Sequence, residues 1–425
     1  MPRSEHAIPG NVDPSRFNLV REIFLDAQRF RGHARRAFLK QRCQGDSDLL
    51  AQVVDLLKHD ESDSSVLDKP LVQMDRPVDK PSTRMLRRPQ TVKEIGRFHL
   101  LQVLGEGASG ITSLAKHPQS ASRRAVVKVL HPELATPEAF EAIEPRITVD
   151  FRALGALRQH ASSRLIECGR VADGSIFVAT DFVPGEPILT YCDRVRAPIR
   201  TRIFLFLDAC AAVHAAHQCG VFHAGITPGN ALVRMAGDVP TVTVLDFGVA
   251  RALHDDLGRR REWVQARLAH GAVEYLAPEQ VGETPRPADA ATDVYGLGAL
   301  LYELLVGAPV FDRFALRRAG MGDFPRILEE QAPRDPGAHA AELCKASPDV
   351  ADRRSTGTKE LPLEIKHDLA SIVLKAIQKS PVSRYATAES LADDLRNHLD
   401  AKPVSAAPGF GQRVKSLVDR FRTGS

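Results

Sequence analysis

Residues 1–60 carry a helical pattern of apolar positions. Val20 and Phe24 lie four positions apart, which places them on one face of a helix. A second apolar run at helical spacing, Leu49–Leu57, follows Asp46, a residue type that caps helix N-termini. We therefore expect a small all-helical unit at this end of the chain.

The pattern changes twice more along the chain. The stretch after residue 60 is rich in charge and proline and poor in apolar side chains, which predicts a linker. Alternating apolar positions then indicate strands, and a mainly helical pattern follows. We expect an α+β fold made of a linker at 61–92, a β-rich lobe at 93–183, a larger helical lobe at 184–400 and a basic tail at 401–425.

Composition narrows the class of protein. The 425 residues are 43% apolar and 26% charged, which excludes a disulfide scaffold, a collagen-like chain and a wholly disordered chain. The 57 basic and 53 acidic side chains give a net charge of only +4, so the chain shows no electrostatic sign of a nucleic-acid partner. The six cysteines form no C-x-x-C pair, which is typical of reduced thiols and argues against structural zinc.

The sequence indicates neither a targeting segment nor a membrane span. Its first residues contain no apolar signal core. The most apolar long stretch, Val294–Phe311, contains Glu303 and two tyrosines, which predicts a buried core helix. We expect a cytoplasmic protein without a transmembrane segment.

Three glycines form a G-x-G-x-x-G motif: Gly105, Gly107 and Gly110. The motif alone is weak because it also occurs by chance. A dinucleotide-binding fold needs a helix directly after the glycines, whereas residues 111–115 are β-branched and alternating and predict a second strand. A strand, glycine loop and strand in this order are typical of a loop that covers nucleotide phosphates.

Three further motifs follow in a fixed order. A β-rich run ends in Lys128, the sequence Asp-Phe-Gly begins at Asp246 after an apolar strand, and Ala-Pro-Glu ends at Glu279. A lysine at the end of a strand is by itself an ordinary surface residue. Four motifs in this order and spacing together indicate a site for nucleotide phosphates and magnesium.

The segment from Ile95 to about Leu399 resembles the eukaryotic-like (Hanks-type) serine/threonine protein kinases of bacteria. The resemblance extends to Tyr191–Arg194, Asp293–Gly298 and Ser383–Ala388. Part of the N-terminal unit, Phe38–Asp46, also resembles a helical region that precedes the kinase domain in many of these proteins. The resemblance implies a two-lobed protein-kinase fold that binds ATP and Mg²⁺.

The resemblance also assigns roles residue by residue. The three glycines and Lys128 would hold the phosphates, and Asn230 and Asp246 would hold magnesium. Glu279 and Arg384 would form a buried ion pair, and His223 and Asp293 would support the catalytic loop. The remaining nucleotide-site residues are Thr180 as gatekeeper, Asp181–Val183 as the adenine-binding hinge, Leu232 in the pocket, and Asp150 as the helix carboxylate paired with Lys128.

The chain departs from the family pattern in its catalytic loop. Gly225 stands where an aspartate would orient the substrate hydroxyl and accept its proton, and glycine can do neither. Thr227 replaces the lysine of the family's catalytic loop. Ala272 replaces a threonine that would form hydrogen bonds with both that aspartate and that lysine. Ala224 replaces an arginine that would bind an activation-loop phosphate, and residues 249–279 contain no Ser or Thr to carry one.

These correlated losses favour a pseudokinase that acts as a scaffold or allosteric regulator in signalling. The alternative is an active serine/threonine kinase that works without the usual base, since phosphoryl transfer depends mainly on positioning and magnesium. We expect partners among other signalling proteins, including an active kinase or the substrate of one.

Two features leave alternatives open. We expect ATP binding because the glycines, Asn230 and Asp246 are retained. Asp150 is one methylene shorter than the expected glutamate, and Val126 is larger than the usual alanine. These two replacements leave open how accessible the nucleotide pocket is. Glu141 and Glu144 would need a different helix path to replace Asp150. The tail carries an apolar stripe flanked by basic residues, which suits an anionic membrane, a partner groove or its own helical lobe. The stripe consists of Val414, Leu417, Val418 and Phe421.

Overall fold

The computed structural model divides the chain into two compact units, Met1–Arg88 and Pro89–Ser425. It describes residues 94–406 with short gaps at 133, 135–136, 156–162, 172, 255–259, 271 and 283–285, and seven separate positions between 39 and 54. Several of those seven are helical, and Asp46 Oδ1 accepts a hydrogen bond of 2.9 Å from the Leu49 amide, as in a helix N-cap. Most of the expected helical unit, the linker at 61–92 and the apolar stripe of the tail lie outside the described residues.

The first lobe is built on one antiparallel sheet, with strands in the order β1-β2-β3-β4-β6-β5. Side chains on one face of this sheet are buried, because alternate residues of a strand point to the same side. Ala115, Val127 and Phe177 belong to that face. The strands are β1 (Glu94–Ile95), β2 (Phe98–Gly107), β3 (Gly110–His117), β4 (Ser120–Leu130), β5 (Leu165–Arg170) and β6 (Ile176–Asp181).

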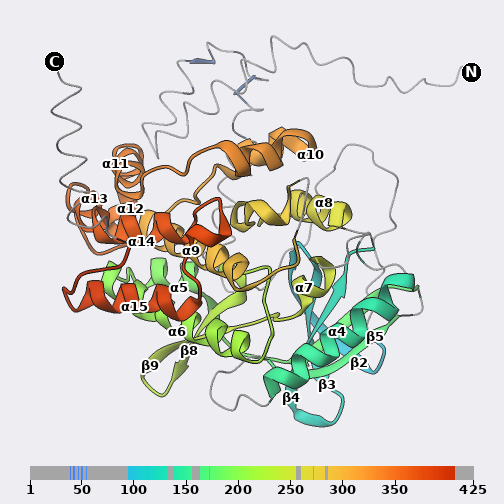
Figure 1. The fold of residues 1–425 in the computed structure, drawn as a ribbon. Coiled ribbons are helices and arrows are strands. Elements are labelled where there is room, and N and C mark those ends of the chain that lie inside the picture. Colours follow the sequence, from blue (N-terminus) through green and yellow to red (C-terminus); the bar gives the residue numbers. More distant parts are fainter. Residues whose placement is uncertain are drawn as a thin grey trace, which may run out of the picture. The chain divides into compact units, whose positions relative to one another are not determined.

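A single long helix, α4 (Pro137–Gly155), covers this lobe and packs against β5 (Figure 1). Its buried residues Ile143, Ile147 and Phe151 recur every four positions and so form one apolar stripe. The helix continues through Pro145, so Glu144 and Asp150 lie on the same helix. The different helix path considered for the glutamates is therefore not what the structure shows.

The second lobe is mainly helical and carries a small sheet of order β7-β8-β9 at its edge, where β9 packs against α6 (Figure 1). Its strands are β7 (Glu186–Pro187), β8 (Ala231–Ala236) and β9 (Val239–Val244). Its helices are α5 (Ile188–Arg194), α6 (Ile199–Gln218), α7 (Val249–His254), α8 (Arg260–His270), α9 (Ala290–Val306), α10 (Arg313–Glu330), α11 (Pro336–Ala346), α12 (Asp349–Asp352), α13 (Glu360–Ile365), α14 (Asp368–Ala376) and α15 (Ala388–Leu399). Single 3-10 turns are η1 (Pro228–Asn230), η2 (Val273–Tyr275), η3 (Pro278–Gln280) and η4 (Pro381–Ser383).

Helix α9 forms the centre of this lobe. Every residue from Thr292 to Val306 is buried, as the sequence predicts for this apolar stretch. Two fully buried arginines close its C-terminal end: Arg202 donates to the carbonyl of Leu304, and Arg354 donates to those of Glu303, Leu304 and Leu305. Cations at this end satisfy the unpaired carbonyls and the helix dipole. Within the described residues, no helix is long and apolar enough to cross a membrane.

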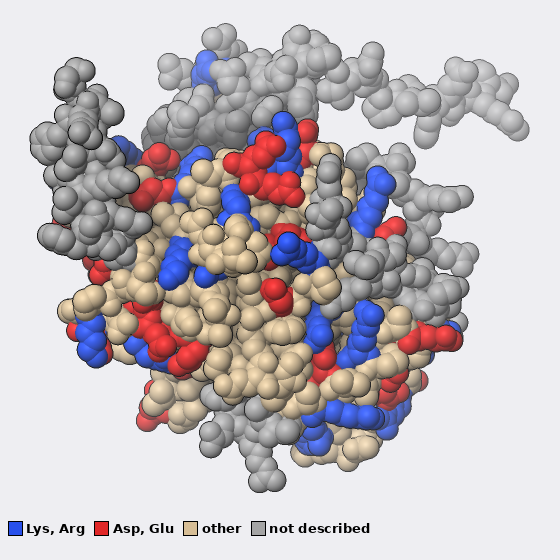
Figure 2. All heavy atoms as spheres, viewed as in Figure 1, with Lys and Arg blue, Asp and Glu red and all other residues tan. Residues whose placement is uncertain are grey.

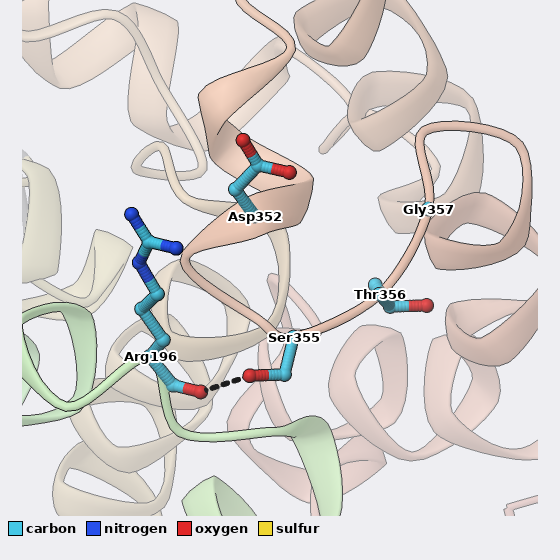
Figure 3. A pocket seen from close by; sticks show the side chains of 5 residues that line it. All are labelled: Arg196, Asp352, Ser355, Thr356 and Gly357. Carbon is cyan, nitrogen blue, oxygen red and sulfur yellow. Dashed lines mark hydrogen bonds between the residues drawn. The ribbon is translucent and has the colours of Figure 1, made fainter.

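A hollow of about 430 Å³ lies on the helical lobe between the segment after α5 and the turn after α12. Ser355 Oγ donates to the backbone carbonyl of Arg196 at 2.5 Å across its floor, and Asp352, Thr356 and Gly357 line it (Figure 3). None of these residues belongs to the motifs that the sequence analysis identified.

An ion pair between Glu279 and Arg384 joins two distant parts of the helical lobe. The two groups form a bidentate pair at 2.6 and 2.7 Å, and the Arg384 side chain is fully buried. Arg384 also donates to the carbonyls of Gln378, Lys379 and Ala291, so its charge is well satisfied. Removing one partner of such a pair leaves an uncompensated buried charge.

We expect Glu279→Gln to lower the free energy of unfolding by about 3–5 kcal/mol, because Arg384 would remain buried without its carboxylate. Glu342→Gln is the control, since the Arg334–Glu342 pair at 3.4 Å is more than half exposed on both sides. An exposed pair contributes at most about 1 kcal/mol. Urea unfolding of both variants compares the two losses, and similar values would contradict the prediction.

Candidate nucleotide and phosphotransfer site

The glycine motif forms the turn between β2 and β3, where Gly107 pairs with Gly110. Gly110 has φ = 153°, and a Cβ there would lie 1.9 Å from the Val129 carbonyl oxygen, so this strand pair requires glycine. A Cβ at Gly105 or Gly107 would meet no atom within 4 Å. Those two glycines therefore leave open space in which phosphates can approach the backbone.

The lysine expected to bind phosphate and the aspartate expected to bind magnesium lie together. Lys128 is on β4, Asp246 follows β9, and their side chains form an ion pair. Asp246 has φ = 63°, an uncommon conformation for a residue other than glycine. The pair joins the two lobes at the base of the glycine loop.

Asp150 does not take the position expected for it. Among the described residues, the ion pair of Lys128 is with Asp246, whereas Asp150 Oδ1 lies 3.4 Å from Arg251 Nη1. Helix α7 packs against α4 and brings Arg251 to this short carboxylate. Asp150 also lies over the Asp-Phe-Gly turn, since a Cβ at Gly248 would be 2.9 Å from its Oδ2. The expected Lys128–Asp150 pair is replaced by two other pairs.

The backbone of the catalytic loop is held by Asp293. Its carboxylate accepts hydrogen bonds from the amides of His223 and Ala224 at 2.7 and 2.8 Å, and from His217 Nε2 at 2.8 Å. Burial acts to raise the pKa of Asp293, but these hydrogen bonds and neighbouring histidines hold it below its ordinary value. Burial lowers the pKa of His223, whose Nε2 donates to the Leu245 carbonyl at 2.8 Å.

Asn230 and Asp246, the residues expected to bind magnesium, lie at the same end of the strand pair β8–β9. Asn230 directly precedes β8 and Asp246 follows β9, and the pairing of Ala231 with Val244 brings both to the same end of the strands. Asn230 Nδ2 donates to the Gly225 carbonyl at 3.1 Å, which leaves its side-chain oxygen for a cation. No cluster of three or more metal-binding side chains occurs among the described residues. An amide oxygen and a carboxylate fit Mg²⁺, which takes its other ligands from phosphates and water.

The expected adenine site lies at the end of β6. Thr180 pairs in register with Val126 of β4, so both are in the roof of the site. Asp181 Oδ2 is bound by Arg123 at 2.6 Å and Arg164 at 3.2 Å, and the Asp181 amide donates to the Arg164 carbonyl at 2.9 Å. In the part of the chain that the structure describes, the Val183 amide makes no hydrogen bond. Leu232 lies on β8, opposite Pro187.

The position of the missing catalytic aspartate is filled by other residues. A Cβ at Gly225 would lie 2.6 Å from the Ala250 Cβ and 3.3 Å from Arg267 Nη1. Contacts below 3.0 Å between such atoms require a shift of the backbone, because Ala250 is itself buried in α7. The loop therefore has no room for any side chain at this position.

The other two replaced positions keep their backbone roles. The Thr227 carbonyl accepts a hydrogen bond of 3.1 Å from the Asn230 amide, so Thr227 begins η1. Ala272 has φ = 72° at the start of η2, a conformation that costs free energy in alanine. Neither side chain carries a charge or a second functional group for the transferred phosphoryl.

The segment between Asp246 and Glu279 folds into helices, which the sequence analysis did not identify. Helix α8 packs against β2, α7 and α10, and so contacts both lobes (Figure 1). Its residue Trp263 is the one tryptophan of the chain and is 1% exposed, and Arg267 is 3% exposed. The signal was present in the helical spacing of Trp263, Val264, Arg267 and Leu268, which form one face.

Comparison with known proteins identifies the family. A model described as "Protein kinase domain" matches residues 98–395. Serine/threonine-protein kinase PknB of Mycolicibacterium smegmatis is 31% identical over 334 residues, which are 77% of this chain and 46% of that protein. A probable serine/threonine-protein kinase of Streptomyces coelicolor is 30% identical over 322 residues, 74% of this chain and 42% of the other. The chain spans less than half the length of both relatives.

A solved structure also matches. The crystal structure of the PknI kinase domain of Mycobacterium tuberculosis covers 72% of this chain and 97% of its own, with a TM-score of 0.47 and 21% sequence identity. The family model includes the glycine loop, Lys128, the catalytic loop and Asp246. The predicted family and two-lobed α+β fold are therefore confirmed, and the chain belongs to the protein kinase family, with relatives among the bacterial serine/threonine kinases.

Proposed function

We propose that this chain is a nucleotide-binding pseudokinase that acts as a scaffold or allosteric regulator in signalling. The observation that carries the proposal is the filled space at Gly225, where Ala250 and Arg267 occupy the place of the catalytic side chain. A kinase that had lost only the carboxylate would keep room for it. Here Ala250 of α7 and Arg267 of α8 lie 2.6 and 3.3 Å from the Cβ position, so the packing leaves no such room.

Nucleotide binding is supported by what the site retains. Gly105 and Gly107 leave open space at the phosphate loop, and Asn230 and Asp246 lie at one end of two paired strands. Lys128 and Asp246 now neutralise each other. A bound Mg-ATP would replace that pair by two new ones, phosphate with Lys128 and magnesium with Asp246.

The proposed partners are other proteins of a signalling system, such as an active kinase or its substrate. On the face seen in Figure 2, basic and acidic side chains of the described residues are interspersed, without a continuous basic stripe. Such a stripe is the usual mark of a nucleic-acid site. A mixed surface is compatible with protein partners.

An active kinase is the second candidate, because Lys128, Asn230 and Asp246 are all present. Phosphoryl transfer through a loose transition state depends mainly on positioning and charge, so slow turnover without a base is chemically reasonable. Measurement of phosphate transfer decides between the two functions.

We expect phosphate transfer to be absent or far below that of a working kinase when the full chain is incubated with Mg-ATP labelled in the γ-phosphate and a generic protein acceptor, with Asp246→Ala as the control for contaminating kinase. Loss of the general base costs about 10²–10⁴ in rate, so an ordinary kinase rate of about 1–100 per second would fall to roughly 10⁻⁴–1 per second. The rate should fall further because Thr227 cannot replace the lysine. Robust transfer that Asp246→Ala abolishes would establish the active-kinase function instead.

Gly225→Ala should lower the free energy of unfolding by about 1–3 kcal/mol, because its methyl group would overlap Ala250. Gly229→Ala is the matched control in the same loop, since a Cβ there has only an ordinary contact of 3.8 Å with Thr227 Oγ1. It should change stability by less than about 1 kcal/mol. For the same reason, Gly225→Asp should fail to restore phosphate transfer. Equal stability of the two alanine variants would show that the space at Gly225 is not filled.

Mg-ATP at about 100 times its dissociation constant should raise the melting temperature by several degrees, since such saturation adds about 2.7 kcal/mol to the free energy of unfolding. Lys128→Met should weaken binding, whereas Lys116→Met, an exposed lysine on the neighbouring strand β3, should leave it unchanged. A flat thermal-shift titration up to millimolar Mg-ATP would remove nucleotide binding from the proposal.

A further inference from the structure

Arg267 of helix α8 lies where the side chain of a catalytic aspartate would project. Its Nη1 and Nη2 atoms are 3.3 and 3.7 Å from the position of a Cβ at Gly225. The charge at this position is therefore opposite to the one that a working catalytic loop carries. The guanidinium comes from the segment between Asp246 and Glu279, not from the catalytic loop itself.

Among the described residues, no carboxylate forms an ion pair with the buried Arg267 guanidinium. The residue is 3% exposed and lies 4.8 Å over the ring of Trp263, and its Nε has no hydrogen-bond partner. Among the described residues, no hydrogen bond or ion pair reaches the other guanidinium nitrogens. Glu274 is the carboxylate whose charge acts on Arg267, but Glu274 lies 3.5 Å from Arg313. Burial lowers the pKa of Arg267 to about 10, so it remains a cation at neutral pH.

A buried cation whose N–H donors meet no acceptor among the described residues is costly, and natural proteins pair such groups. The planar guanidinium binds carboxylate or phosphate through two parallel hydrogen bonds. The side chain therefore has the features of one half of an anion site. A ligand that reaches the catalytic loop can supply this anion.

The surroundings of Arg267 indicate which anion this is. The Gly225 carbonyl accepts a hydrogen bond from Asn230, one of the two residues that fit magnesium. In phosphoryl transfer, the catalytic aspartate orients a hydroxyl that attacks the γ-phosphorus, so a group in its place is close to the γ-phosphate. An arginine at this point neutralises phosphate charge, which the missing loop lysine no longer does.

We propose that Arg267 binds the terminal phosphate of a bound nucleoside triphosphate. This proposal rests on the nucleotide binding proposed above and adds a specificity to it: the chain distinguishes ATP from ADP. A bound triphosphate would also hold α8 against the catalytic loop, because Arg267 belongs to that helix. Loss of the terminal phosphate would release this contact and leave the cation unpaired again.

The test compares affinities of the full chain for Mg-ATP and Mg-ADP by titration calorimetry. Wild type should bind Mg-ATP about ten- to a hundredfold more tightly, the effect of a hydrogen bond to a charged group. Arg267→Met, which keeps the length and the contact with Trp263, should lose this preference while its affinity for Mg-ADP stays within about twofold. Arg261→Met, an exposed arginine on the same helix, should behave as wild type.

A second measurement separates phosphate binding from a structural role. Without nucleotide, Arg267→Met should melt at the same temperature as wild type or higher, because it removes an unpaired buried charge. A lower melting temperature, or a variant that does not fold, would show that the guanidinium stabilises the empty protein and would overturn the proposal. Equal wild-type affinities for the two nucleotides would overturn it while leaving nucleotide binding intact. Binding of neither nucleotide would overturn both.

Discussion

The arrangement of the catalytic loop depends on one buried carboxylate, that of Asp293. It accepts the amide hydrogens of His223 and Ala224 and a hydrogen bond from His217. These bonds fix the loop through its backbone, whatever side chain follows. The loop therefore keeps the left-handed conformation at Ala224, with φ = 60°, although neither the arginine nor the aspartate of the family pattern is present. The hydrogen bonds that hold the backbone of the catalytic loop are thus independent of the side chains that would carry out phosphate transfer.

Because the loop backbone is fixed independently, the space that the catalytic side chain vacates can be used by other elements. Helices α7 and α8 pack there through Ala250 and Arg267, with Trp263 buried behind them. In the same packing, Arg251 forms an ion pair with Asp150, and Lys128 forms an ion pair with Asp246. The close packing at Gly225 therefore occurs together with two ion pairs, Lys128 with Asp246 and Asp150 with Arg251.

These ion pairs give the site a defined chemical character. Lys128 and Asp246, which we propose to bind phosphate and magnesium, form an ion pair, and the Arg267 guanidinium lies beside Gly225. Such a site attracts the charge of a nucleotide and contains no side chain at Gly225 that removes a proton from a substrate hydroxyl. Binding without transfer is the behaviour that this arrangement supports best, and the family relatives are kinases that the chain matches over less than half of their length.

The sequence by itself determined the family, the two lobes and the buried helix around Val294. It did so because apolar periodicity and the order of glycine, lysine and Asp-Phe-Gly motifs are local properties of the chain. The loss of the catalytic carboxylate was equally readable, since Gly225 has no side chain in any fold. Only the tertiary structure decided which carboxylate meets which cation and what fills the space at Gly225. Those contacts join α4 and the catalytic loop to α7 and α8, which lie far from α4 in sequence, so packing sets the distances between them.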